Sequence, residues 1–110
     1  MVKIIDAKSR AVICSDALMC SSMWRKARGL MLSRRKNLVF VLWRPSRVRL
    51  HMLFVFFSID VVGLDEKKRV VCLARLKPFR FWRAPVKVKY IVELSKRPYQ
   101  VPSIGSRLAF

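Results

Sequence analysis

The chain has 110 residues, the usual size of one domain, which leaves no room for two independent hydrophobic cores. Hydrophobic residues make up 54% of the chain, which excludes intrinsic disorder and allows folding without disulfide or metal staples. Because 24 lysine and arginine residues are balanced by only 6 aspartate and glutamate residues, the formal net charge is +18, and we expect a polyanionic partner such as nucleic acid, an acidic protein or a membrane surface.

The cysteines and the apolar segments indicate in which cellular compartment we expect the protein. Cys14, Cys20 and Cys72 cannot all pair within one chain, and Asp6 lies where a secretory signal would need a continuous apolar stretch. We therefore expect reduced thiols and a cytoplasmic location. The longest apolar stretch, residues 50–64, contains polar residues and falls short of the roughly 20 residues that span a bilayer, so no transmembrane helix is expected.

The first third of the chain predicts two short strands followed by one helix. Residues 2–5 and 11–14 have strand-like composition and flank a polar turn. From Ser21 or Ser22 onward, apolar residues recur at helical spacing after a serine that suits an N-cap. The pattern therefore predicts a short amphipathic helix that ends near Gly29, because glycine favours the residue after a helix.

The middle of the chain predicts strands. Residues 38–43 form a β-type run after a basic loop, and the segment 44–46 should end it, because its proline cannot donate a hydrogen bond to a central ladder. Residues 47–57 alternate, with one apolar face and another face that begins cationic and becomes apolar. This second pattern predicts a long strand that enters deeper packing as it proceeds.

Residues 59–64 and 69–76 predict a β-hairpin, because the polar segment 65–68 between them suits a tight turn at the surface. Residues 87–94 alternate again and predict another strand. The side chains of that strand expected to face outward are those of Lys87, Lys89, Ile91 and Glu93.

Residues 107–110 predict a last strand after a turn at residues 104–106. Strands that recur at short spacing, with turn signals between them, are typical of closed or layered β structures. The sequence therefore predicts a mainly β fold of α+β type, a small antiparallel barrel or sandwich with one short N-terminal helix, in a single domain over residues 1–110.

Three stretches resemble the family known as domain of unknown function 192. They are Arg-Gly-Leu-Met at residues 28–31, the segment 51–65 with its Ile-Asp-Val-Val core, and the segment 76–94 with Tyr-Ile-Val-Glu-Leu at its end. The resemblance implies a compact β-rich domain with one short helix, and it implies no activity. The chain departs from the family at Gly105-Ser106, where the family shows Gly-Asp, and it is far more basic than the family pattern requires.

The segment 79–83 interleaves aromatic rings with guanidinium groups, the side chains that stack on unpaired bases and neutralise phosphates. The leading hypothesis is therefore a binding module for RNA or single-stranded DNA. Its aromatic residues could instead fill the core beneath the neighbouring prolines. The predicted nucleic-acid-binding set consists of Arg34, Arg35, Lys36, Arg47, Arg49, Phe79, Arg80, Phe81, Trp82, Arg83, Lys87 and Lys89.

A second hypothesis is a small-ligand binder or enzyme with a pocket near Arg28, His51 and Asp60. A histidine such as His51 could act as an acid or base, because an unperturbed imidazole titrates near neutrality, but the sequence supplies no nucleophile beside it. Asp60 lies within an apolar run, where the plainer interpretation is a buried carboxylate that is hydrogen-bonded for structural reasons. A third hypothesis is an interaction protein whose basic face docks an acidic partner.

Recognisable catalytic and cofactor motifs are absent from the sequence. The cysteines and His51 have no spacing typical of zinc ligands, so we expect no metal. With 3 glycines in the chain there is no phosphate-binding loop and no Gly-x-Ser-x-Gly elbow, so no cofactor and no catalytic residue are assigned. A binding role is favoured over an enzymatic one, and the oligomeric state is left open.

Overall fold

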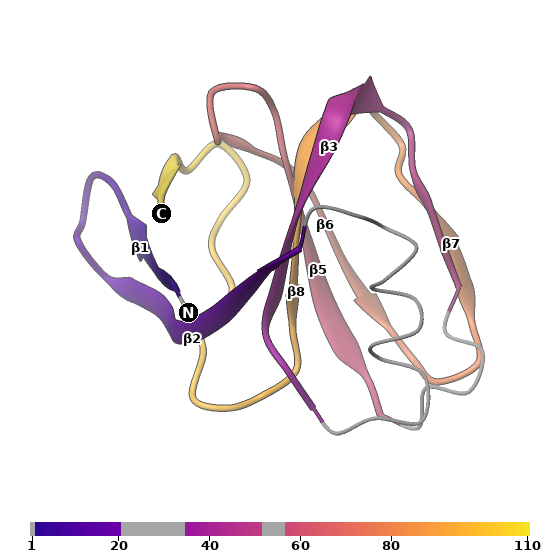
Figure 1. Ribbon diagram of the computed structural model, residues 1–110, viewed down its shortest axis with the longest axis horizontal. Helices are drawn as coiled ribbons and strands as arrows, with labels where there is room; N and C mark the ends of the chain where they lie inside the picture. Colours follow the sequence, from indigo (N-terminus) through magenta and orange to yellow (C-terminus); the bar gives the residue numbers. More distant parts are fainter. Residues whose placement is uncertain (1, 21–34, 52–56) are drawn as a thin grey trace.

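The computed structural model describes residues 2–20, 35–51 and 57–110 (Figure 1). The described strands form a seven-stranded sheet in the order β6-β5-β8-β3-β2-β1-β9 and a two-stranded ribbon of β4 and β7. Their bounds are β1 (Val2–Asp6), β2 (Val12–Cys20), β3 (Leu38–Ser46), β4 (Arg49–His51), β5 (Ile59–Leu64), β6 (Val70–Leu76), β7 (Phe81–Arg83), β8 (Val88–Leu94) and β9 (Leu108–Ala109).

The mainly β fold class is confirmed. The long sheet curls, so that β1 and β2 lie to one side of the central strands and the β4–β7 ribbon lies to the other (Figure 1). One pair differs from the antiparallel expectation, because β2 and β3 run parallel with Leu18 opposite Leu38. The connection over residues 21–37 is long enough for such a crossover. The predicted helix at residues 21–29 lies outside the described residues.

The predicted hairpin is confirmed as β5 and β6, which pair antiparallel from Ile59 opposite Leu76 to Leu64 opposite Val70. Its turn is held locally by Asp65, whose Oδ1 accepts the backbone N–H groups of Lys67 and Arg69. Such contacts within four residues are the kind that a sequence pattern can predict.

The central strands are buried on both faces, which corrects the expectation that Ile91 and Glu93 face outward. Successive residues of β8 belong to two separate core clusters. Ile91 packs with Phe40 and its neighbours, whereas Val92 packs with Ile4 and its neighbours. The curl of the sheet causes this, because β1, β2 and β9 cover one face of β8 and other segments cover the opposite face. Alternation in β8 therefore separates two cores rather than core from solvent.

Several strand boundaries also differ from the sequence expectation, and β7 was not predicted as a strand. β2 continues to Cys20 rather than ending at Cys14, because its second half pairs with β3. β3 continues through Pro45 to Ser46, which the proline was expected to prevent. The pairing of β3 with β8 is irregular between Val41 and Ser46, so no regular ladder hydrogen bond is required of Pro45. Of the predicted long strand at residues 47–57, β4 forms a strand, whereas residues 47, 48 and 57 are described and lie outside any strand. Residues 52–56 lie outside the described residues.

Candidate functional site

The β4–β7 ribbon brings together two parts of the predicted nucleic-acid-binding set. Arg49 on β4 lies directly opposite Arg83 on β7, and His51 lies opposite Phe81. Like charges directly across a strand pair repel each other, so this pairing concentrates uncompensated positive charge on the ribbon. The register therefore juxtaposes residues that are 30 to 34 positions apart in the sequence.

Hydrogen bonds attach the ribbon to the end of β3. Arg47 Nε donates to the backbone oxygen of Ala84 at 3.1 Å, and the Ala84 N–H donates to Val48 O at 2.8 Å. Lys89 on β8 reaches across the same corner, where its Nζ donates to Trp43 O at 2.9 Å. These contacts hold the side chains of Arg47 and Lys89 beside the ribbon.

Exposed aromatic rings are the second feature of this region. Trp43 is 93% exposed, Phe81 is 78% exposed and Phe79 is 49% exposed. Among the residues that the structure describes, these are the aromatic side chains that are strongly exposed. Trp82 is not among these exposed rings, because it packs against the core cluster that contains Phe40 and Ile91. The alternative interpretation of the aromatic segment predicted such packing.

We call this region the ribbon end. It comprises the β4–β7 ribbon together with exposed aromatic and cationic residues of the segments that lead into and out of its two strands. Its members are Trp43, Arg47, Arg49, Phe79, Arg80, Phe81, Arg83, Lys87 and Lys89.

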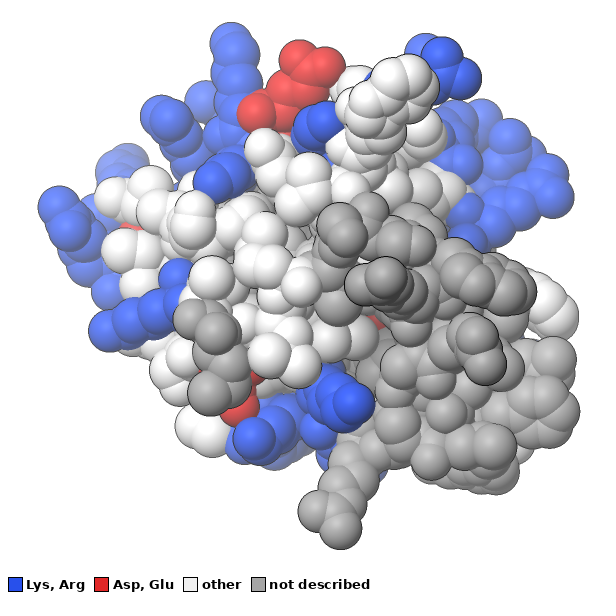
Figure 2. Space-filling view, viewed as in Figure 1, with Lys and Arg blue, Asp and Glu red and all other residues white. Residues whose placement is uncertain are grey.

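The predicted set does not gather in one place. Arg35 and Lys36 precede β3, whereas Arg47 follows it, and the nine residues of β3 separate them. At about 3.3 Å per residue, the two groups lie at opposite ends of a strand roughly 30 Å long. Figure 2 likewise shows lysine and arginine side chains in several groups around the rim of the molecule. Arg34 lies outside the described residues.

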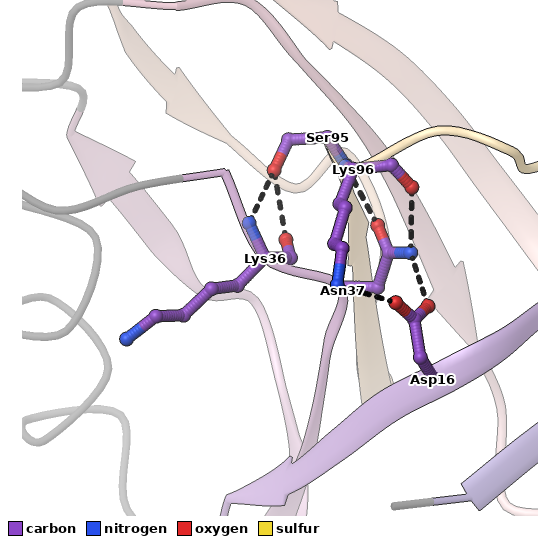
Figure 3. Close-up of polar contacts among 5 residues, drawn as sticks. All are labelled: Asp16, Lys36, Asn37, Ser95 and Lys96. Atoms are coloured by element: carbon purple, nitrogen blue, oxygen red, sulfur yellow. Dashed lines mark hydrogen bonds and ion pairs between the residues drawn. The ribbon is translucent and has the colours of Figure 1, made fainter.

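At the start of β3, Asn37 connects three segments (Figure 3). Its Oδ1 accepts the backbone N–H groups of Ser95 and Lys96, each at 3.0 Å. Its Nδ2 donates to Lys96 O at 2.8 Å and to Asp16 Oδ1 at 3.0 Å. The almost fully buried amide therefore uses both of its donors and accepts two hydrogen bonds, which ties β2, β3 and the segment after β8 together.

Ser95 extends this network to Lys36. The Ser95 hydroxyl donates to Lys36 O at 2.7 Å and accepts the Lys36 N–H at 3.0 Å. The Asn37 amide and the Lys96 ammonium together hold the pKa of Asp16 below its ordinary value, the amide hydrogen bond being the larger cause. The network fixes the backbone next to Arg35 and Arg97, which flank it in the sequence.

Asp60, one of the three predicted pocket residues, is 8% exposed and accepts a 2.6 Å hydrogen bond from the Tyr99 hydroxyl at Oδ2. Burial raises the pKa of Tyr99, and the hydrogen bond to Asp60 adds to that rise. Asp60 belongs to β5 of the long sheet, whereas His51 belongs to β4 of the ribbon. Arg28 lies outside the described residues.

The carboxylates of the chain are mostly engaged by neutral groups. Asp6 caps the β1–β2 turn by accepting the N–H groups of Lys8 and Ser9, and these hydrogen bonds lower its pKa. Asp65 caps the β5–β6 turn in the same way. These carboxylates keep their negative charge, and the surplus of positive charge in the fold follows from the composition, with a formal net charge of +18.

The described cysteine thiols and acidic side chains are not arranged as reactive or metal-binding groups. Cys14 and Cys72 are free and buried, and burial raises the pKa of both thiols, which disfavours the reactive thiolate. Within residues 2–20, 35–51 and 57–110, no three His, Cys, Asp or Glu side chains are grouped as metal ligands would be. In the same ranges, no helix has the length and hydropathy to cross a membrane.

Sequence reasoning missed two residues that the structure places at the candidate sites. Trp43 was assigned only to a strand, although an exposed tryptophan is followed there by Arg44 and Pro45, which is an available signal. Tyr99 was missed as the partner of Asp60. Its signal is absent from the local sequence, because the two residues are 39 positions apart.

Residues 4–105 match the family described as "Uncharacterized ACR", which is domain of unknown function 192. The chain belongs to this family. The resemblance stated from the sequence motifs is therefore confirmed, and the family is one of unknown function.

Curated relatives include proteins of Thermococcus and Pyrococcus species. A UPF0127 protein of Thermococcus sibiricus is 41% identical over 76 residues, which is 66% of this chain and 49% of that protein. A UPF0127 protein of Pyrococcus horikoshii is 37% identical over 81 residues, covering 71% of this chain and 70% of that protein. The chain thus spans about half the length of the Thermococcus relative.

Two crystal structures share the fold. A protein of unknown function from Novosphingobium aromaticivorans superposes with a TM-score of 0.74 at 15% identity, covering 98% of this chain and 82% of that one. A chain from Sinorhizobium meliloti, named as a candidate transcription regulator, superposes with a TM-score of 0.77 at 16% identity, covering 97% of this chain and 89% of that one. At these identities the likeness shows the fold alone.

Proposed function

We propose that this protein binds single-stranded RNA or DNA through the ribbon end. The observation that carries the proposal is the ribbon register, in which Arg49 lies opposite Arg83 and the exposed ring of Phe81 is two residues away on β7. The exposed ring of Trp43 lies on β3, the strand that leads into the ribbon. Aromatic faces stack on bases of any sequence, and guanidinium groups neutralise the phosphates between them.

Exposure of these rings has a cost in water. An indole that is 93% exposed contributes almost nothing to folding through burial, so its placement is better explained by a surface that becomes covered in a complex. The arginines of the ribbon are likewise unfavourable without a partner. Arg49 and Arg83 repel each other across the ribbon, and a phosphate backbone relieves that repulsion.

The proposed contact is to the backbone and the base faces rather than to base edges. The ribbon end offers arginine, lysine and aromatic side chains, while the carboxylates of the fold are used in turns and in buried contacts. Phosphate contacts give affinity without sequence information. We therefore expect little discrimination between sequences and a preference for unpaired over duplex nucleic acid.

A fluorescence-anisotropy titration with a labelled mixed-sequence RNA and a single-stranded DNA tests the proposal. If the five cations Arg47, Arg49, Arg83, Lys87 and Lys89 contact phosphates, log K should fall with log salt at a slope of roughly −3 to −4. Absence of binding to both oligonucleotides at low salt would overturn the proposal. Equal binding to duplex and to single strands would contradict the stacking part of it.

A pair of charge-reversal variants separates the ribbon end from net charge alone. Arg49→Glu with Arg83→Glu should abolish most of the affinity. The matched control is Arg69→Glu with Arg107→Glu, because these two exposed arginines also lie opposite each other, in a bridge that belongs to another part of the fold. Both double variants change the net charge equally, so equal losses of affinity would refute a localised interface.

Aromatic substitutions test the stacking contribution. Trp43→Ala and Phe81→Ala should each weaken binding by about 1–3 kcal/mol, the range for one base stacked on an aromatic ring. Both side chains are largely exposed, so the unfolding midpoint should stay nearly unchanged. A variant that keeps full affinity would remove its ring from the interface.

A further inference from the structure

A cavity of about 380 Å³ lies at the end of the sheet where β3 begins, opposite to the end of β3 that leads into the ribbon. It forms where β3 and β5 begin and where β6 and β8 end, so that residues from four separate segments meet there. Its volume is within the range of small-ligand sites. The lining residues are Arg35, Ser58, Arg75, Ser95, Arg97 and Tyr99.

We call this cavity the arginine pocket, because three of its lining residues are arginines. Their guanidinium groups make it strongly cationic. Residues 2–20, 35–51 and 57–110 contain all 6 acidic residues of the chain, and within them Arg75 and Arg97 make no ion pair. The carboxylate nearest in the register is that of Asp60, opposite Arg75 on the neighbouring strand. The Tyr99 hydroxyl already donates to that carboxylate. The positive charge of the pocket is therefore only partly compensated by the protein.

The hydroxyl groups of the pocket define what a ligand must supply. Ser95 donates to Lys36 O, and Tyr99 donates to Asp60, so neither hydroxyl has a proton left for a ligand. The groups that remain for recognition are the guanidinium N–H groups and the Ser58 hydroxyl. All of these are donors, and a ligand that satisfies them must be rich in acceptor atoms and negatively charged.

The backbone beside two of the three arginines is held in advance. The Asn37 and Ser95 hydrogen bonds fix the backbone on either side of the pocket, immediately after Arg35 and immediately before Arg97 (Figure 3). The Arg35 guanidinium also lies 4.9 Å from the centre of the Phe57 ring, a cation–π contact that limits its freedom. A site that is organised before the ligand arrives loses less entropy on binding.

We propose that the arginine pocket binds a small phosphate monoester. Such a group carries a charge between −1 and −2 near neutral pH, and its three terminal oxygens give each guanidinium an acceptor of its own. A carboxylate offers one charge and two oxygens, which a single arginine can satisfy. The pocket is separate from the ribbon end, so this proposal does not depend on nucleic-acid binding.

Isothermal titration calorimetry with glycerol 3-phosphate tests this proposal on the full chain at low salt. We expect saturable binding with one site, no binding of glycerol, and weaker binding of succinate. Arg75→Gln and Arg97→Gln should each reduce the affinity by roughly tenfold or more, as expected for loss of a charge-assisted hydrogen bond. Arg107→Gln, which removes an exposed arginine outside the pocket, should leave the affinity unchanged.

Three results would overturn the proposal. They are the absence of glycerol 3-phosphate binding, equal effects of the pocket variants and Arg107→Gln, and tighter binding of succinate than of the ester. Binding of a 5′-phosphorylated oligonucleotide that is lost in Arg75→Gln, without binding of glycerol 3-phosphate, would assign the pocket to a nucleic-acid end instead. Because Arg75 and Arg97 are exposed, circular dichroism should confirm that both variants remain folded.

Discussion

The Tyr99 hydroxyl donates a 2.6 Å hydrogen bond to Asp60 Oδ2, and this contact fastens the segment after β8 to the start of strand β5. The carboxylate that accepts it is 8% exposed. Hydrogen bonds to charged groups contribute more to stability than bonds between neutral groups. The contact also forms one wall of the arginine pocket, so it serves both the stability of the sheet end and the shape of the cavity.

Tyr99→Phe should lower the free energy of unfolding by about 1.5–3 kcal/mol, because it leaves the buried Asp60 carboxylate without this donor. Urea unfolding followed by tryptophan fluorescence measures the loss. Tyr90→Phe is the matched control, since Tyr90 contributes its ring to an edge contact with Phe110. A similar loss in both variants would mean that the hydroxyl of Tyr99 has no special role.

Asn37→Ala should be among the most destabilising single substitutions. It removes the partner of the Ser95 and Lys96 N–H groups together with two donated hydrogen bonds, in an almost fully buried position. Unsatisfied buried groups cost about 1–3 kcal/mol each, so we expect a loss of roughly 3 kcal/mol or more. Gln100→Ala, at an exposed amide, should cost little in the same urea titration.

The contribution of Asp16 should depend on pH. Its pKa is lower in the folded chain than the ordinary 3.8, because Asn37 and Lys96 stabilise the carboxylate. A depressed folded pKa gives stability that is fully present above the unfolded value and is lost as the pH falls through the folded value. The difference in unfolding free energy between the natural chain and Asp16→Asn should therefore be constant at neutral pH and shrink below about pH 4. A difference that grows on acidification would contradict this assignment.

Gly63→Ala should destabilise the sheet by crowding its core. A Cβ at this position would lie 2.8 Å from Val88 Cγ1 and in direct conflict with Cys72 Sγ. Overpacking of this kind costs about 1–3 kcal/mol. Thermal unfolding measures the loss, and adding Cys72→Ala to Gly63→Ala should recover part of it by removing the sulfur. An unchanged midpoint in Gly63→Ala would show that β5 and β6 can separate without cost.

The candidate sites could be predicted only in part. Arg47, Arg49 and the segment 79–83 were grouped because basic and aromatic residues recur in them, and strand pairing places Arg49 opposite Arg83. Arg35 entered the same group on composition alone, but it lies at the other end of β3 in the arginine pocket. A net charge can be read from a sequence, whereas the positions of the charges depend on pairing across long sequence separations.

The sequence by itself determined the mainly β class, the β5–β6 hairpin and the need of Asp60 for a hydrogen-bond partner. These follow from local alternation, from turn residues such as Asp65 and from the cost of a carboxylate in an apolar run. The tertiary structure decided that β8 separates two cores, that Tyr99 is the partner of Asp60, and that three arginines share one cavity. Each of these depends on how distant segments meet as the sheet curls, and local residue patterns carry no information about that meeting.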